Sequence, residues 1–347
     1  MNEIRIFKFD PKIDILSYYK PYLLQNLDFK TVKQMLIKIK EDDPYLDFSQ
    51  AKYIKINGFS VKLDDEIDFK KFDDTIYISP LCEKNSYKDL NINMDDFYAK
   101  LLPFKDMINN DDKAFYDTLF ANFYANKIVH FTDKFLGNSA FIFARYLSEK
   151  YLDKKGEILD IMKSQMAYYR PGDFLNVEEE ENKGFVYFCN KLGFKFDDDK
   201  KILDTNVLDK YEISNFEPKF TNFNIAVYND KQCQNLAKKF GGKIIKFDLQ
   251  NDDILQNVNE IYKFDKDCAL RLAGEILFDA FDNGADFLLV NSEFAFKFFD
   301  ENADKIETLF GRKFIDFYIL KMDEFLELLQ GKSLASLKEH KLKVSLV

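Results

Sequence analysis

Apolar and polar residues along the first ninety positions follow the spacing of short strands around one helix. Ile4 and Ile6 alternate with polar neighbours, so residues 3–9 are expected to form a strand that ends at Asp10-Pro11. Apolar residues then recur at the spacing of one helical face: Val32, Met35, Leu36 and Ile39. Asp43-Pro44 should close this helix, because a residue before proline is pushed out of the helical region.

A hairpin is the next feature of this region. The dipeptide Asn57-Gly58 separates the alternating runs 53–56 and 59–63, and such a pair favours a type I′ turn, which needs two positive φ angles. A further strand is expected at 75–78. Strands, helix and hairpin together predict a β-grasp domain over residues 1–94.

The following residues favour helices. Segment 95–170 has few breakers, Leu101, Phe104 and Ile108 have helical spacing, and one long helix is expected from Phe141 to Tyr151, after the breaker Gly137. We treat 171–220 as a connecting region. Its charged runs at 178–184 and 197–201 are expected to be solvated and lack a calcium-loop pattern.

The remaining segment, 221–347, alternates between strand and helix patterns. Strands are expected at 224–228, 243–247, 287–290 and 314–320, with helices at 230–240, 269–281, 294–299 and 323–329. Alternation of this kind predicts a parallel sheet covered by helices on both faces. The fold class is therefore multidomain α+β: a β-grasp domain, a helical middle domain and a C-terminal α/β domain.

Composition restricts the partners. The chain has 347 residues, a formal net charge of −10 and a pI near 5.0, so nucleic acid and anionic membrane surfaces are poor partners. No run approaches the roughly 20 apolar residues of a spanning helix, and the N-terminus lacks the apolar core of a signal peptide. We expect a cytoplasmic protein without membrane insertion. Cysteines at wide spacing are expected to be reduced, buried thiols: Cys82, Cys189, Cys233 and Cys268.

Several short segments of the first region resemble the first domain of the iron-sulfur subunits of succinate dehydrogenase and fumarate reductase: Ile6–Pro11, Asp43-Pro44, Ile56–Gly58, Ile78–Leu81 and Lys88–Leu90. The resemblance implies a C-x4-C-x2-C loop before the hairpin and a fourth cysteine after it, around a 2Fe-2S cluster. Here Phe48–Gln50 leads directly towards Tyr53, and the fourth position falls near Leu63 or Asp64. The loop is missing, and the expectation is that the cluster is lost.

Two further resemblances also lack their ligands. Phe135–Ala140 resembles the Phe-x-Gly-Pro-x-Ala segment of the same subunits, whose flanking cysteine runs bind 4Fe-4S and 3Fe-4S clusters, but 120–133 and 156–170 contain no cysteine. Gly284–Ser292 and Met322–Leu326 resemble the cysteine-rich domain of heterodisulfide reductase B subunits. The Cys-Pro-x-Cys positions of that family read Asn291–Phe294 here, and its Cys-Cys-Gly motif is absent from 262–267.

No catalytic, cofactor-binding or metal-ligating residue is assigned from the sequence, and no cofactor is expected. His130 is expected to be a helix-packing residue, and His340 lies in a charged tail. Ser139 and Ser292 are interpreted as helix caps. The turn at Asn291-Ser292 could still present backbone N–H groups to an anion, as doubly wound sheets do.

Three functional hypotheses follow. The first is a non-catalytic cytoplasmic binding or scaffold protein derived from an electron-transfer iron-sulfur subunit, an assembly or regulatory partner of a respiratory redox complex. The second is an oxidoreductase accessory subunit that exchanges electrons through the four remaining thiols or an atypical iron-sulfur site. The third is a small-molecule enzyme that uses the C-terminal sheet. The sequence leaves the partner and any small-molecule ligand open.

Overall fold

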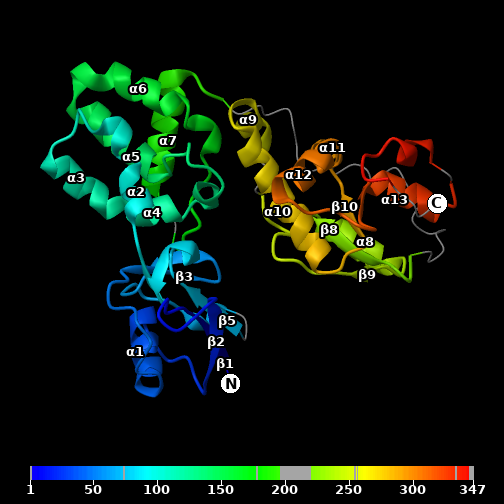
Figure 1. Cartoon of the computed structure of the whole chain (residues 1–347), viewed down its shortest axis with the longest axis horizontal. Coiled ribbons are helices and arrows are strands. Elements are labelled where there is room, and N and C mark those ends of the chain that lie inside the picture. Colours follow the sequence, from blue (N-terminus) through cyan, green and yellow to red (C-terminus); the bar gives the residue numbers. More distant parts are fainter. Residues whose placement is uncertain are drawn as a thin grey trace. The chain divides into compact units, whose positions relative to one another are not determined.

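The chain forms two compact units, Met1–Phe194 and Lys195–Val347 (Figure 1). The computed structural model describes residues 2–72, 75–176, 179–195, 220–253, 255, 257–332 and 334–343. Both units combine helices with strands, which confirms the α+β class. Among the described residues, no helix is both long enough and apolar enough to cross a bilayer.

The first unit begins with a five-stranded mixed sheet of order β2-β1-β5-β3-β4. Its strands are β1 Asn2–Lys8, β2 Tyr18–Leu24, β3 Tyr53–Ile56, β4 Phe59–Lys62 and β5 Thr75–Ser79. β1 runs parallel to β5, with Glu3 opposite Thr75, and the other pairs are antiparallel. The strands expected from the sequence are confirmed. The sequence did not predict β2, which pairs with β1.

The helix and the turn of this region also form as predicted. In α1 (Val32–Asp42), the Thr31 side chain accepts a hydrogen bond from Gln34 N at the start, and Asp43 ends the helix. The predicted apolar face is buried against the sheet in one core. The hairpin residues Asn57 and Gly58 have φ angles of 48° and 89°, the two positive values that a type I′ turn requires.

A helical segment completes the first unit (cyan to green in Figure 1). A short two-stranded sheet, β6 Ser86–Lys88 and β7 Asn91–Ile92, precedes it. Its helices are α2 Asp95–Ala99, α3 Asn110–Tyr116, α4 Phe120–Tyr124, α5 Ser139–Lys150, α6 Lys155–Lys163 and α7 Glu179–Leu192. Aromatic rings fill its interior, and Phe97 stacks on Tyr116 with centroids 4.3 Å apart. The spacing at Leu101–Ile108 gives only one 3-10 turn, Leu102–Phe104.

The acidic run that precedes Gly184 is not solvated linker. Residues 179–192 form α7, which packs on α5, and the Glu181 side chain is only 1% exposed. The two helices lie so close at Gly184 that an added Cβ would stand 2.6 Å from the Phe141 carbonyl oxygen. The second charged run, 197–201, lies outside the described residues.

The second unit contains a four-stranded parallel sheet of order β11-β10-β8-β9, as predicted. Its strands are β8 Asn224–Tyr228, β9 Lys243–Ile244, β10 Phe287–Val290 and β11 Tyr318–Lys321. Its helices are α8 Lys231–Lys239, α9 Val258–Phe264, α10 Lys266–Asp282, α11 Glu293–Glu301, α12 Ala303–Phe310 and α13 Met322–Leu329. β10 is buried at every position, because helices cover both faces of the sheet (Figure 1).

One predicted strand of this unit is wrong in part. β11 starts at Tyr318, because Asp316 has a φ of 54° and interrupts the extended run expected from Phe314. The Phe314 ring instead stacks on Phe278 of α10, with centroids 4.4 Å apart. The β9 strand is shorter than expected, and α9 and α12 were not predicted.

Candidate functional site

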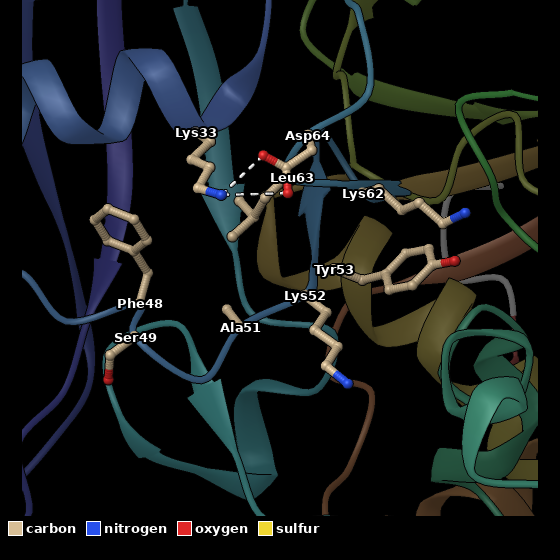
Figure 2. Close-up of a pocket in the computed structure, with 9 residues that line it drawn as sticks. All are labelled: Lys33, Phe48, Ser49, Ala51, Lys52, Tyr53, Lys62, Leu63 and Asp64. Carbon is tan, nitrogen blue, oxygen red and sulfur yellow. Dashed lines mark hydrogen bonds and ion pairs between the residues drawn. The ribbon is translucent and has the colours of Figure 1, made fainter. Parts of the chain in front are cut away.

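A pocket of about 550 Å³ opens beside the hairpin of the first unit (Figure 2). We call it the lysine pocket, and its walls are formed by Lys33, Phe48, Ser49, Ala51, Lys52, Tyr53, Lys62, Leu63 and Asp64. Two backbone hydrogen bonds fix its frame: Leu63 N donates to Lys52 O, and Lys33 N donates to Leu63 O, each at 3.0 Å. α1, the segment leading into β3, and the end of β4 therefore converge on one hollow.

The lysine pocket lies at the place where the sequence resemblance expects the 2Fe-2S loop. Phe48 and Ser49 precede that loop position, Tyr53 follows it, and Leu63 and Asp64 stand where the fourth ligand is expected. Thiolates or imidazoles are the ligands that such clusters need. The walls of this pocket carry amines, rings and one carboxylate instead. Its chemistry is that of anion and aromatic recognition.

Positive charge exceeds negative charge in the lysine pocket. The Lys33 ammonium lies 2.9 and 3.3 Å from the two Asp64 carboxylate oxygens, and both side chains are exposed. Lys62 lies over the Tyr53 ring, 5.6 Å from its centroid. Figure 2 shows Lys33 and Asp64 turned toward one another, whereas Lys52 and Lys62 extend on the side of Tyr53. The walls of the pocket therefore carry three ammonium groups and one carboxylate.

A second hollow of about 290 Å³ lies where the end of β5 meets the helical segment. We call it the thiol cavity, and its walls are formed by Lys55, Ser79, Pro80, Leu81, Cys82, Glu83, Lys84 and His130. The Cys82 Sγ and His130 Nδ1 atoms are 4.0 Å apart. His130 ends a 3-10 turn, Lys127–His130, and is exposed, so the expected helix-packing role is wrong.

Burial and charge keep the two reactive groups of the thiol cavity neutral. Burial raises the pKa of the Cys82 thiol, an effect only partly offset by backbone N–H groups and by Lys55. The pKa of His130 is lowered, first by desolvation of the ring and then by the neighbouring Lys55 ammonium. Near neutral pH this arrangement is a thiol beside an imidazole and not a thiolate–imidazolium pair.

The three remaining cysteines form no disulfide and belong to three different helices. Cys189 is partly buried in α7, whereas Cys233 and Cys268 are buried in α8 and α10. Burial raises the pKa values of Cys189 and Cys233. Within the described part of the chain, no three Cys, His, Asp or Glu side chains are placed to hold a metal ion.

His340 does not lie in an exposed charged tail. It is 3% exposed, and its Nε2 lies 3.1 Å from Glu324 Oε1, which also accepts a hydrogen bond from Ser336 Oγ at 2.9 Å. Its ring lies 4.8 Å from that of Phe296. This contact ties the residues after α13 onto α11 and α13.

The carboxyl edge of the parallel sheet places polar groups between β8 and β10. Asn291 Nδ2 donates to Asp230 Oδ2 at 2.7 Å, and Ser292 caps α11 by accepting from Ala295 N, as predicted. The Asp230 carboxylate lies beside the turn that could have presented N–H groups to an anion, so its charge opposes an anion there. Ser139 is the first residue of α5, which Asn138 precedes as N-cap, so its predicted cap role is wrong.

Comparison with solved structures gives a full-length likeness. No protein-family model matches the chain, and no curated protein matches it in sequence. A crystal structure of a hypothetical protein from Helicobacter pylori matches 100% of this chain and 98% of that one, with a TM-score of 0.76 and 14% identity. At that identity the likeness shows a shared fold.

A second solved structure matches only part of the chain. The Mycobacterium smegmatis Sdh1 complex in the apo form matches 56% of this chain and 98% of that one, with a TM-score of 0.33 and 11% identity. This likeness is weak and partial.

Proposed function

We propose that this chain is a non-catalytic binding or scaffold protein, derived from an electron-transfer iron-sulfur subunit, that serves as an assembly or regulatory partner of a redox complex. The lysine pocket is the observation on which the proposal rests. It occupies the expected position of the 2Fe-2S loop, and its walls offer ammonium groups and rings where cluster ligands would be needed.

The topology of the first unit supports the β-grasp part of this proposal. The sheet order β2-β1-β5-β3-β4 places the parallel pair β1 and β5 at its centre, with hairpins at both sides and α1 packed on one face. A β-grasp domain has this arrangement of a mixed sheet over a single helix. The loss of a cluster loop leaves such a scaffold intact, because its core lies between sheet and helix.

Hydrogen bonds to Glu181 connect residues of the helical segment near the positions where the resemblance expects cluster ligands. Asn122 lies in the stretch where the resemblance expects cluster ligands, and its Nδ2 donates to Glu181 Oε1 at 2.8 Å. Asn138 Nδ2 and Gly172 N donate to Glu181 Oε2, each at 2.9 Å. Buried amides and a carboxylate that satisfy one another occupy this interior.

Exposed apolar residues near the N-terminus supply a second contact surface. Ile13, Ile15 and Leu16 are 80%, 97% and 78% exposed in the connection between β1 and β2. Contiguous apolar side chains in water mark interaction surfaces. We propose that a protein partner covers this loop and places an acidic segment in the lysine pocket, where Lys52 and Lys62 attract it.

Affinity capture with matched variants tests the proposal. The wild-type chain, cross-linked in cells of its source, should retain a redox-complex component. The double variant Lys52→Glu/Lys62→Glu should lose it, because both ammonium groups of the pocket are reversed. The control variant Lys105→Glu/Lys163→Glu changes the net charge by the same amount, but at exposed lysines outside the pocket, and should retain the partner. Recovery without any redox component, or equal recovery by both double variants, would refute the proposal.

The oxidoreductase alternative has a separate test. It needs sulfur ligands in one place, and of the four cysteines only Cys82 has a described imidazole neighbour at 4.0 Å. Iron and labile-sulfide analysis after anaerobic purification decides between the two proposals. A colourless, iron-free protein is expected, and stoichiometric iron with visible absorbance would favour the alternative.

A further inference from the structure

Lys55 brings a positive charge into the thiol cavity without a carboxylate partner. It extends from β3, which lies between β5 and β4 in the sheet. Among the described residues, no carboxylate lies within the 4.0 Å of an ion pair from either Lys55 or Lys84, the second lysine of the cavity. Burial lowers the pKa of Lys55. An enclosed ammonium without a counter-charge is costly, so this position favours an anionic ligand.

The carboxylates around the cavity are already engaged elsewhere. Glu83 accepts a hydrogen bond from the Tyr19 hydroxyl. Asp96 accepts from Asn85 Nδ2 at 2.7 Å and from the Tyr124 hydroxyl. Asp173 lies 3.8 Å from the Lys127 ammonium. The hydrogen bond from Tyr19 leaves the charge of Glu83, itself a residue of the cavity wall, in place, so with Lys55 and Lys84 the wall carries one net positive charge.

The other walls of the cavity suit a small organic anion. The Ser79 hydroxyl can donate a hydrogen bond, and Cys82 and His130 add no negative charge while both are neutral. A volume of about 290 Å³ lies at the lower end of the range for ligand pockets. The whole chain carries a net charge of −10, so this local excess of cations is not a general property of its surface.

We propose that the thiol cavity binds a small organic anion, with its carboxylate or phosphate group held by Lys55 and Lys84 and its body against Cys82 and His130. The ammonium groups act as point charges that accept either anion, whereas the cavity volume limits the size of the ligand. This site is separate from the lysine pocket and does not depend on the proposed function.

Isothermal titration calorimetry measures binding of the anion, and protection of the slowly reacting Cys82 thiol from alkylation shows that the anion lies in the cavity. The full chain is incubated with iodoacetamide, alone or with inorganic phosphate, phosphoglycolate, or dicarboxylates of two to six carbons, and alkylation is followed by peptide mapping. Bound anion should slow alkylation at Cys82 and leave the rate at Cys189, which lies in α7 outside the cavity, unchanged. The phosphate and dicarboxylate arms distinguish the two sources of negative charge.

Lysine variants make the test specific. Lys55→Met should raise the Kd of the protecting anion roughly ten- to a hundredfold, the loss expected for one charged hydrogen bond. Lys84→Met should weaken binding in the same direction. Lys105→Met removes an exposed lysine that does not line the cavity and should bind as the wild type does. Circular dichroism checks that each variant is folded.

Two outcomes overturn this inference. One is that calorimetry detects no binding of any of these anions at millimolar concentration. The other is that protection is the same in the folded Lys55→Met and wild-type chains, because the anion would then bind elsewhere.

Discussion

The Lys8 ammonium lies 2.7 Å from a carboxylate oxygen of Asp89, and both side chains are almost completely buried in the first unit. The pair joins β1 to the turn between β6 and β7 across 81 positions of sequence. Asp89 also accepts hydrogen bonds from Phe9 N at 3.1 Å and Asp47 N at 2.9 Å. Lys8 also lies 3.7 Å from the Asp43 carboxylate, so buried ion pairs of Lys8 join three of the short segments that resemble the iron-sulfur subunits.

Asp89→Ala should lower the free energy of unfolding of the first unit by about 1–3 kcal/mol, because it removes the hydrogen-bonded carboxylate of the buried Lys8 ammonium, which keeps only the more distant Asp43 carboxylate at 3.7 Å. Asp64→Ala is the matched control, since its ion pair with Lys33 is exposed, and it should cost at most about 1 kcal/mol. Denaturant unfolding followed by circular dichroism measures both. Equal losses in the two variants would contradict the structural role of Asp89.

Two glycine substitutions should have opposite signs. Gly184→Ala places a Cβ 2.6 Å from the Phe141 carbonyl oxygen, so α7 must shift from α5 and the unfolding free energy should fall by about 1–3 kcal/mol. Gly156→Ala in α6 meets no atom within 4 Å and should stabilise by up to about 1 kcal/mol through helix propensity. Thermal denaturation of both variants is the measurement, and a stabilised Gly184→Ala chain would show that the helices are not in close contact.

Asp112 should make the first unit sensitive to acid. Burial would raise its pKa, but hydrogen bonds from Asn109 N, Lys150, Tyr151 and Tyr146 outweigh burial and lower the pKa to about 2. A lowered folded-state pKa adds stability that is present above the unfolded value, near 4, and is lost as the pH falls through about 2. The contribution is about 2 kcal/mol.

Unfolding at a series of pH values between about 6 and 2 tests this. The difference in stability between the wild type and Asp112→Asn should shrink as the pH falls, because protonation removes the same charge. Tyr151→Phe removes one of the four donors, at 2.8 Å, and should give an intermediate acid dependence. A wild-type advantage that is constant with pH would contradict the lowered pKa.

Ile15→Ser separates binding from stability. The side chain is 97% exposed, so the unfolding free energy should change by no more than about 0.5 kcal/mol. Retention of the protein partner should decrease, because the apolar contact surface is lost. Capture of the partner and thermal unfolding are measured on the same preparation. Undiminished capture would remove the β1–β2 loop from the proposed interface.

Local signals in the sequence predicted much of the fold. Asn57-Gly58 specifies its turn through two positive φ angles, and α1 is marked by its apolar face and by Pro44, so neither depends on distant contacts. β2 lacks such a signal: it carries Pro21 and exposed positions, and only its pairing with β1 makes it a strand. Distant contacts also determine the burial of His340. Glu324 and Phe296 contact its ring, although charged residues surround it in the sequence.

The candidate sites were only partly predictable. Counting from the hairpin puts Leu63 and Asp64 at the expected position of the fourth cluster ligand. Lys33 reaches the same pocket from α1, and no local pattern in the sequence predicts this contact. Cys82 and His130 are 48 positions apart and belong to no common motif. A residue's pattern reveals its own helix or strand, whereas a cavity depends on which elements pack together.

The hydrogen bonds to Glu181 set the order in which the first unit can be completed. Asn122, Asn138 and Gly172 all precede α7 in the chain, yet all three donate to a carboxylate that α7 carries. During synthesis these donors leave the ribosome before the Glu181 carboxylate that accepts their hydrogen bonds. A nascent chain that ends before position 181 would therefore lack the acceptor for two buried side-chain amides, which would have to bind water instead. This interior can form completely only after α7 has left the ribosome.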